Sequence, residues 1–507
     1  MLEFVSRLRT NRPGIPARKS AGRPASAFNA FAPEPLEARK MLSANPFGQG
    51  TDSHDATTVV YVESNNAAPG KNAVLGYRRD PATGALTELS AGPFFTGGTG
   101  FANGNAGLGP DDSDHELATS PDGRFLFAVN QGSNDVSVFR VHSNGELTLV
   151  GGKPFSSGGV QPVSIGVQGD NIYVTNRGDE LQGSLGTIPG SYVGFHVRPN
   201  GSLTAIPGAN VTLPQGLSAA QSLVSPDGKF LFGDNFTPPP LLNLPLANTI
   251  DPFVIGKSGQ LIPAPGGPVG APVTPPLVLG LANNPNLPII YAGLTAAGRV
   301  GVFSYDSTGA VTFRTSVPDA GNGACWTTVS ADGKFLYVSN SGSDDVGVYS
   351  LADPLNPVQI QEFNLGGPKQ PAGDTTPGNK TVDFQLALDP SGKNLFVVNH
   401  ETADAPGFSG GNQLHALSVA ADGTVSEPSA SPVIFSESQV PSTAHPQGVV
   451  VLSLGGRENG GESNPFSPNA FDGDKSNGNG NGSNADRPSL DVDSIVDHAK
   501  DGNNAHG

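Results

Sequence analysis

The sequence predicts an all-β protein, a seven-bladed β-propeller made of four-stranded antiparallel blades. The first observation is a turn-and-strand phrase that recurs along the chain. The second is its spacing, because the strands of the seven copies begin 46 to 65 residues apart, which is typical of propeller blades. The copies are VVYVES from Val59, SPDGRFLFAVN from Ser120, NIYVTN from Asn171, SPDGKFLFGDN from Ser225, PIIYAG from Pro288, SADGKFLYVSN from Ser330 and DPSGKNLFVVN from Asp389.

Each strong copy contains a turn followed by a strand. Pro-Asp-Gly favours a tight turn, and the alternating apolar run behind it is typical of a half-buried strand. In the second copy a whole blade can be assigned. Its four strands are HELATS (115–120), RFLFAVN (124–130), DVSVFRVH (135–142) and ELTLV (146–150).

The two ends of the repeat region complete each other. VVYVES at Val59 has no inner strand before it, and HPQGVVVL (445–452) looks like an inner strand with nothing after it. Pairing the two would close the ring and remove two open sheet edges. We therefore expect a propeller over residues 57–454, a basic leader without regular structure over 1–56, and a disordered acidic Gly/Asn-rich tail over 455–507.

Composition limits the classes of function. The formal net charge is −17, although residues 1–50 carry eight Lys/Arg against three Glu. An acidic body argues against nucleic acid as a partner, and no apolar run is long enough to span a membrane. The single cysteine, Cys325, cannot form an internal disulfide, and no cluster of Cys and His indicates a metal. We expect no metal, no cofactor and a monomer.

The blade phrases carry a family resemblance. SPDGRFLFAVNQGSNDVSVFRVHSNGEL and SADGKFLYVSNSGSDDVGVYSL resemble the seven-bladed lactonase family, which includes 6-phosphogluconolactonase and the carboxymuconate cyclases. The resemblance spans residues 57–454 and is strongest in the second, third and sixth blades. IYVTNRG (172–178) is also similar to the signature of YVTN propellers of bacterial surface proteins.

The resemblance implies a site of His, Arg and Glu at one mouth of the channel. Arg177 stands in TNRGDE where members often have NRG, and His115 opens an inner strand where members often have His. After VVN the usual acidic residue is replaced by His400, and Glu401 follows one place later. We predict His115, Arg177, His400 and Glu401 as the catalytic candidates. Arg177 would hold an anion, and His115 or His400 would transfer a proton.

Loop lengths indicate which face of the ring carries the site. Short turns such as PDG and SNG fall on one side, whereas the long connections fall on the other. The long-loop face receives the starts of the inner strands and the ends of the second strands. It therefore gathers the candidates, with Asn235, Trp326 and His445 as further binding residues, and we expect Arg177 to be an exposed rim residue there.

The sequence leaves two functions open. The first is hydrolysis of a sugar-derived or small acidic lactone. The second is an exported, non-catalytic propeller that binds a glycan, a peptide or a cell-surface partner. PLEARKMLSA (35–44) resembles the "LExRxLLSA" leader motif of exported bacterial proteins, so we expect export.

Overall fold

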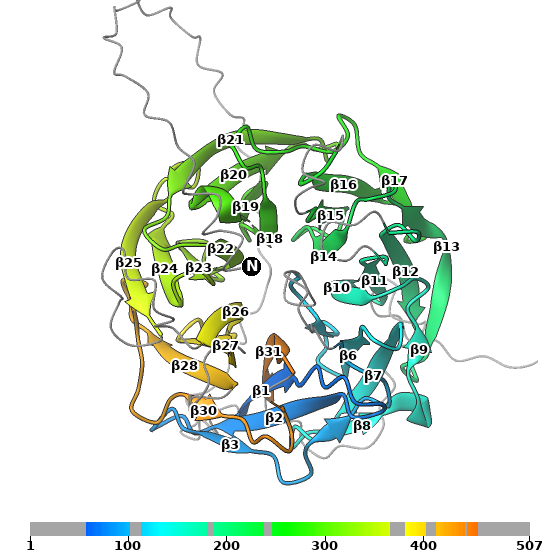
Figure 1. Cartoon of the computed structure of the whole chain (residues 1–507), viewed down its shortest axis with the longest axis vertical. Coiled ribbons are helices and arrows are strands. Elements are labelled where there is room, and N and C mark those ends of the chain that lie inside the picture. The colour runs from blue at the N-terminus through cyan, green and yellow to red at the C-terminus, as the bar shows by residue number, and fades with distance from the viewer. Residues whose placement is uncertain are drawn as a thin grey trace, which may run out of the picture. The chain divides into compact units, whose positions relative to one another are not determined.

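The computed structural model describes residues 57–101, 113–179, 186–237, 246–365, 381–401, 412–441 and 444–454. These residues belong to the compact unit Met1–Arg457 and form seven antiparallel sheets arranged in a ring around a central axis, which is called the channel here (Figure 1). One edge strand of each sheet lies next to the channel and the other lies at the periphery. The predicted seven-bladed propeller is confirmed.

The strands of the first four blades are given from the channel outward. Blade one contains β31 (Gln447–Leu454), β1 (Thr57–Glu63), β2 (Ala73–Arg79), β3 (Leu86–Glu88) and β4 (Phe94–Phe95). Blade two contains β5 (Leu117–Thr119), β6 (Phe125–Asn130), β7 (Asp135–Val141), β8 (Leu147–Leu149) and β9 (Phe155–Ser156). Blade three contains β10 (Pro162–Gln168), β11 (Asn171–Asn176), β12 (Ser191–Val197) and β13 (Leu203–Thr212). Blade four contains β14 (Ala219–Val224), β15 (Phe230–Asn235), β16 (Ile250–Ile255) and β17 (Leu261–Pro263).

The last three blades follow the same order. Blade five contains β18 (Val278–Asn283), β19 (Ile289–Leu294), β20 (Arg299–Tyr305) and β21 (Val311–Pro318). Blade six contains β22 (Ala324–Val329), β23 (Phe335–Asn340), β24 (Asp345–Ser350) and β25 (Val358–Asn364). Blade seven contains β26 (Thr381–Leu388), β27 (Asn394–Glu401), β28 (Gln413–Val419), β29 (Val425–Ser426) and β30 (Val433–Ile434). Two short 3₁₀ turns, η2 (Val150–Gly152) and η4 (Thr295–Ala297), complete the described elements.

The repeated phrase forms a self-contained turn. In the second blade the Ser120 hydroxyl accepts a hydrogen bond from the Phe125 amide at 2.9 Å and donates to Asp122 at 2.7 Å. Gly123 has a φ of 66°, which a side chain would oppose. The same serine-to-strand hydrogen bond recurs at Ser225 and Ser330. The phrase recurs because a turn of this kind joins the inner strand to the second strand within a blade.

Ring closure takes the predicted form. β31 pairs antiparallel with β1, with Thr57 opposite Leu454 and Val60 opposite Val451. The last described strand therefore becomes the inner strand of the first blade, and β1 has no open edge. Blade one is the one blade assembled from both ends of the described chain.

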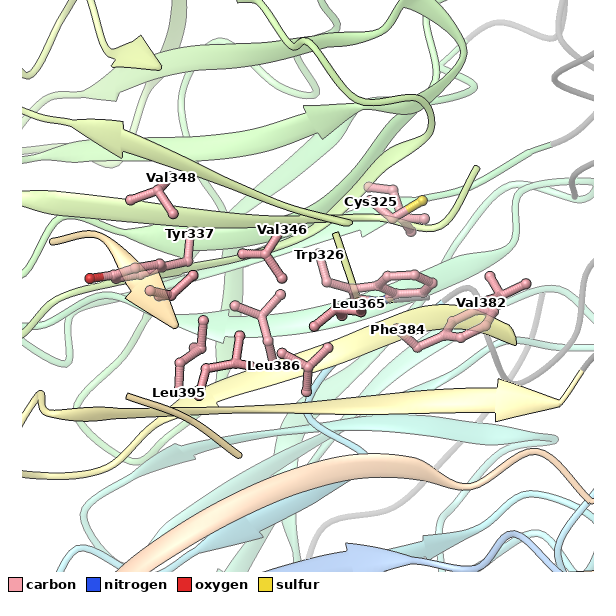
Figure 2. Close-up of a cluster of buried hydrophobic side chains, with 14 of the residues drawn as sticks. Cys325, Trp326, Tyr337, Val346, Val348, Leu365, Val382, Phe384, Leu386 and Leu395 are labelled. Atoms are coloured by element: carbon pink, nitrogen blue, oxygen red, sulfur yellow. The ribbon is translucent and has the colours of Figure 1, made fainter. Parts of the chain in front are cut away.

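Hydrophobic clusters lie between neighbouring blades. The cluster of blades six and seven includes Trp326, Phe384, Leu386 and Leu395, and Figure 2 shows these side chains between the two sheets. Buried tyrosines add hydrogen bonds from one blade to the next. The Tyr61 hydroxyl donates to the Gly145 carbonyl at 2.6 Å, and equivalent bonds join Tyr173 to Gly259 and Tyr337 to Gly423. The blades are thus fixed to each other by packing and, at these three interfaces, by a tyrosine hydrogen bond as well.

Candidate functional site

The segment Ser113–Glu116, just before β5, runs into the channel. The Ser113 hydroxyl is within hydrogen-bond reach of the Val163 carbonyl at 2.7 Å and of the Ala220 carbonyl. Its own carbonyl accepts from Trp326 Nε1 and, at 2.8 Å, from Gln385 Nε2. These partners come from the inner strands of blades three, four, six and seven, so Ser113 lies on the axis of the ring.

Three side chains that contact this segment share one position in the blade repeat, and Glu116 of the segment occupies the same position in its own blade. Each stands four residues before the Ser or Asp that begins the inner turn: Glu116, Gln221, Trp326 and Gln385. Gln385 Nε2 also donates to the Glu116 carboxylate at 2.8 Å. All four are at most 1% exposed, so in these four blades this position is buried next to the channel.

His115 is half-buried, and its hydrogen bonds determine its neutral tautomer. Gln221 Oε1 accepts from the Leu281 amide at 2.5 Å, and its Nε2 donates to the Leu281 carbonyl at 3.0 Å. The same Nε2 is 3.3 Å from His115 Nδ1, which must therefore accept. Neutral His115 then carries its proton on Nε2. The expectation that His115 opens the inner strand is corrected, because β5 begins at Leu117 and His115 has a left-handed φ of 65°.

Arg177 follows β11 and is only 3% exposed, so the expectation of an exposed rim residue is wrong. Its Nε donates to the Ser218 hydroxyl at 2.9 Å, and its backbone amide donates to the Gln161 carbonyl at 2.8 Å. Its guanidinium lines a cavity of about 10 Å³ with Ser113, Ser218 and Phe236. That volume is close to what one water molecule needs. Arg177 therefore lies beside Ser113, on the side of blades three and four.

On the opposite side of Ser113 four aromatic rings contact one another in a row. The Trp326 ring packs against Phe384 with centroids 4.6 Å apart (Figure 2). Phe384 stacks on His400 at 3.8 Å, and His400 stacks on His445 at 4.9 Å. His400 Nε2 is 2.5 Å from the Pro446 carbonyl, which is an acceptor, so Nε2 carries a proton there. The stack connects His400 and His445 to the channel through Trp326.

The other two predicted site residues are placed differently. Asn235 is fully buried, and its Nδ2 donates to Thr249 and Asp251 within blade four. Asn130 and Asn340 make the same kind of hydrogen bond, because their Nδ2 atoms donate to Asp135 and Asp345 at the start of the next strand. The structure gives Glu401 a place at the end of β27, but its side chain lies outside what is described.

Buried carboxyl groups surround this mouth. Burial raises the pKa of Asp114, whose carboxylate accepts a hydrogen bond from the His115 amide at 2.8 Å. Burial and the neighbouring Asp251 charge hold the pKa of Asp234 well above its usual range. Burial raises the pKa of Asp251 to about 7. The charge of Asp114 also raises the pKa of Asp234.

Several residues of the site were not predicted from the sequence. Ser113, Ser218, Gln221 and Gln385 were not among the predicted residues, yet they contact Arg177, His115 or the Ser113 carbonyl. Aligning the blade repeats on their turns would have identified the two glutamines, because they occupy the same repeat position as Trp326. Ser113 had no such signal, since it lies in a long connection.

The described residues place limits on other kinds of site. No group of three or more His, Cys, Asp or Glu among them is arranged to hold a metal. In the same ranges no helix is long and apolar enough to cross a membrane.

The fold and the site define a seven-bladed propeller with an arginine, a histidine and paired amide and indole donors at one channel mouth. The family model described as "Lactonase, 7-bladed beta-propeller" matches residues 70–182 and 276–402. This match confirms the resemblance to the lactonase family over these two ranges, which include the fifth blade, where the sequence phrase is weaker, whereas blade four lies outside the match. None of the curated proteins matches the chain significantly.

Solved structures share the fold. A putative 6-phosphogluconolactonase from Bacteroides fragilis is 19% identical with a TM-score of 0.56, and the match covers 80% of this chain and 100% of that one. A periplasmic gluconolactonase from Pseudomonas aeruginosa is 18% identical with a TM-score of 0.55, covering 79% and 100%. A second putative 6-phosphogluconolactonase, from Bacteroides uniformis, is 19% identical with a TM-score of 0.53, covering 78% and 100%. At these identities the likeness concerns the fold.

Proposed function

We propose that this protein is a lactone hydrolase that acts on a small acidic or sugar-derived lactone at the Ser113 mouth of the channel. The observation that carries the proposal is the position of Arg177 and His115 on a family-typical scaffold, around one point of the channel. Two of the similar solved structures bear the name 6-phosphogluconolactonase and one the name gluconolactonase. The proposal extends that chemistry to this chain.

The arrangement supplies the elements that lactone opening requires. The attacking water loses a proton as it adds to the lactone carbonyl, negative charge develops on the carbonyl oxygen, and the ring oxygen takes up a proton as it leaves, so that one proton passes overall from the water to the leaving oxygen. Arg177 carries a fixed positive charge in a buried setting, where it stabilises an anion more strongly than in water. The His115 Nε2–H can donate a hydrogen bond to the ring oxygen while that oxygen takes up a proton.

The second candidate is a non-catalytic propeller that binds a glycan, a peptide or a surface partner. One observation favours it: Ser113 fills the mouth, and the cavity beside Arg177 is only about 10 Å³. A hydrolase would need this segment to move. The two functions therefore differ in whether a lactone gains access to Arg177.

Acid release from a panel of lactones, followed by pH-stat, tests the hydrolase. Arg177→Gln should reduce kcat/KM at least about 100-fold, because losing a buried cation that pairs with an anionic group of the bound substrate or transition state costs about 3 kcal/mol. Arg299→Gln is a matched control, since Arg299 makes the same Nε-to-serine bond, to Ser316 at 2.7 Å, on the third strand of blade five. No hydrolysis above the spontaneous rate on any lactone would overturn the proposal and favour the binding protein.

Export is a separate proposal, based on PLEARKMLSA (35–44). A reporter fused behind residues 1–56 should leave the cytoplasm of a bacterial host. The control is the same fusion with Glu37 and Arg39 replaced by alanine, which should be retained if the motif is read. A reporter that stays wholly cytoplasmic with the natural leader would contradict export.

A further inference from the structure

The Ser113 carbonyl oxygen accepts hydrogen bonds from two side chains on the channel axis. Trp326 Nε1 and Gln385 Nε2 both donate to it, and they come from the inner strands of adjacent blades. An indole N–H can only donate, and the Gln385 amide is oriented because its Oε1 accepts from the Gly448 amide at 3.3 Å. Two N–H groups directed at one carbonyl oxygen are the geometry that stabilises a carbonyl as it becomes an oxyanion.

We propose that Trp326 and Gln385 form a binding site for the carbonyl of an ester or lactone, and that the Ser113 carbonyl occupies it as an internal ligand. The inference rests on the proposed function, because it names the donors that would hold the substrate carbonyl at the same mouth. Arg177 would then hold the substrate's acidic group on the opposite side of Ser113, rather than its carbonyl.

The attachment of Ser113 is consistent with an exchangeable ligand. Its hydroxyl and carbonyl are held by the carbonyls of Val163 and Ala220 and by two side chains, outside the pairing of β5 with β6. Two residues later, the left-handed φ of His115 turns the chain before the strand begins. Displacing Ser113 therefore leaves the blade hydrogen bonds in place.

Ligand exchange also explains the position of the arginine cavity. Ser113 forms one wall of the cavity that Arg177 lines, and its carbonyl is bound on the side of blades six and seven. A ligand replacing Ser113 would thus meet a cation on one side and two N–H donors on the other. A small lactone carrying a carboxylate or phosphate has this combination of groups.

Trp326 is the sole tryptophan of the chain, so its fluorescence reports on this site alone. The probe is D-glucono-1,5-lactam, which retains the ring carbonyl and resists hydrolysis. Titration of the full-length protein should give a saturable change in emission. Ser113→Ala removes the hydroxyl anchor and should tighten binding about fivefold, because less of the site is occupied internally.

Gln385→Leu should weaken lactam binding about tenfold, as expected for the loss of a carbonyl hydrogen bond in a closed site. The matched control is Gln361→Leu. Gln361 also joins blades six and seven, through two hydrogen bonds to the Val425 backbone, but it lies on the outer strand of blade six. Trp326→Phe, which keeps an aromatic ring and removes the N–H, should weaken binding similarly when measured by calorimetry. A melting curve of each variant shows that it is folded.

The outcomes separate the two proposals. If the lactam changes the emission of neither the natural protein nor Ser113→Ala, or if Gln385→Leu binds as well as the control, the carbonyl site is overturned and Ser113 is a structural plug. Lactone hydrolysis that depends on Arg177 would then still stand. If the lactam binds through Gln385 but no lactone is hydrolysed, the carbonyl site stands and the hydrolase proposal fails.

Discussion

At the residue scale, the site depends on bulges at the starts of the inner strands. The register shifts by one or more residues between Leu279 and Ala282 in β18, and between Ala324 and Thr327 in β22. Such bulges redirect a side chain from the sheet face, here toward the channel. Trp326 lies within the β22 bulge, which explains why an inner-strand aromatic reaches Ser113.

Gly280 gives a direct test of this packing. It has a φ of 64°, and a Cβ there would lie 2.2 Å from the Cys325 carbonyl oxygen and 2.6 Å from Trp326 Cα. Gly280→Ala should lower the free energy of unfolding by about 2–3 kcal/mol and shift the emission of Trp326. Chemical denaturation measures the first effect.

Gly392 provides the control for the backbone contribution. Its φ is 68°, but nothing lies within 4 Å of a Cβ built on it. Gly392→Ala should lower the free energy of unfolding by about 1–2 kcal/mol, which is the cost of a side chain in the left-handed backbone conformation. Equal losses in the two variants would show that the close approach between blades five and six contributes nothing.

At the element scale, the strands were predictable and the bulges were not. The PDG-type turns and the alternating runs behind them determine second strands such as β6 and β23 within a residue or two, because their signals are local. The inner strand β5 starts two residues later than expected, since the Ser113–Glu116 segment is held by neighbouring blades rather than by its own sheet. Contacts of that kind have no local sequence signal.

The closing strand is the element on which the ring depends. Removing residues 447–454 would expose the unpaired edge of β1 and one side of the cluster that contains Val60, Val62 and Val449. We expect this deletion to lower the melting temperature by at least about 10 °C or to cause aggregation. A chain ending after Arg457 keeps every described residue and is the control. A deletion variant that melts with the control would show that closure by β31 is dispensable.

At the scale of the whole molecule, the sequence predicted the channel mouth better than its contents. Strand order alone brings His115, Arg177 and Trp326 to one face, because the starts of inner strands and the ends of second strands meet there. The burial of Arg177 was missed, because it results from a segment that crosses between blades. The repeat pattern predicts the strands of each blade, whereas the channel contains the Ser113–Glu116 segment, which belongs to a connection between blades.

The molecule also buries several carboxyl groups near the ends of its second strands. Asp383 is fully buried, and its Oδ2 accepts from the Asn340 amide at 3.0 Å. Burial, together with the charges of Asp344 and Asp345, holds the pKa of Asp383 well above its usual range. Burial raises the pKa of Asp345 to about 6. Unfolding would release both groups to ordinary carboxyl pKa values.

These shifts predict that the protein is more stable in mild acid than above neutral pH. A folded-state pKa above the unfolded value stabilises the fold fully below the unfolded pKa, near 4, and this stabilisation is lost as pH rises through the folded pKa. Thermal denaturation should therefore show a melting temperature that falls between pH 5 and pH 8. Asp383→Asn, which mimics the neutral acid, should raise the free energy of unfolding by about 1–3 kcal/mol at pH 8 and change it little at pH 5. The control is Asp422→Asn, because Asp422 is exposed and hydrogen bonds to Thr424 lower its pKa, so its replacement should not stabilise at pH 8. A melting temperature for Asp383→Asn that follows the natural protein at every pH would remove Asp383 as a source of the pH dependence.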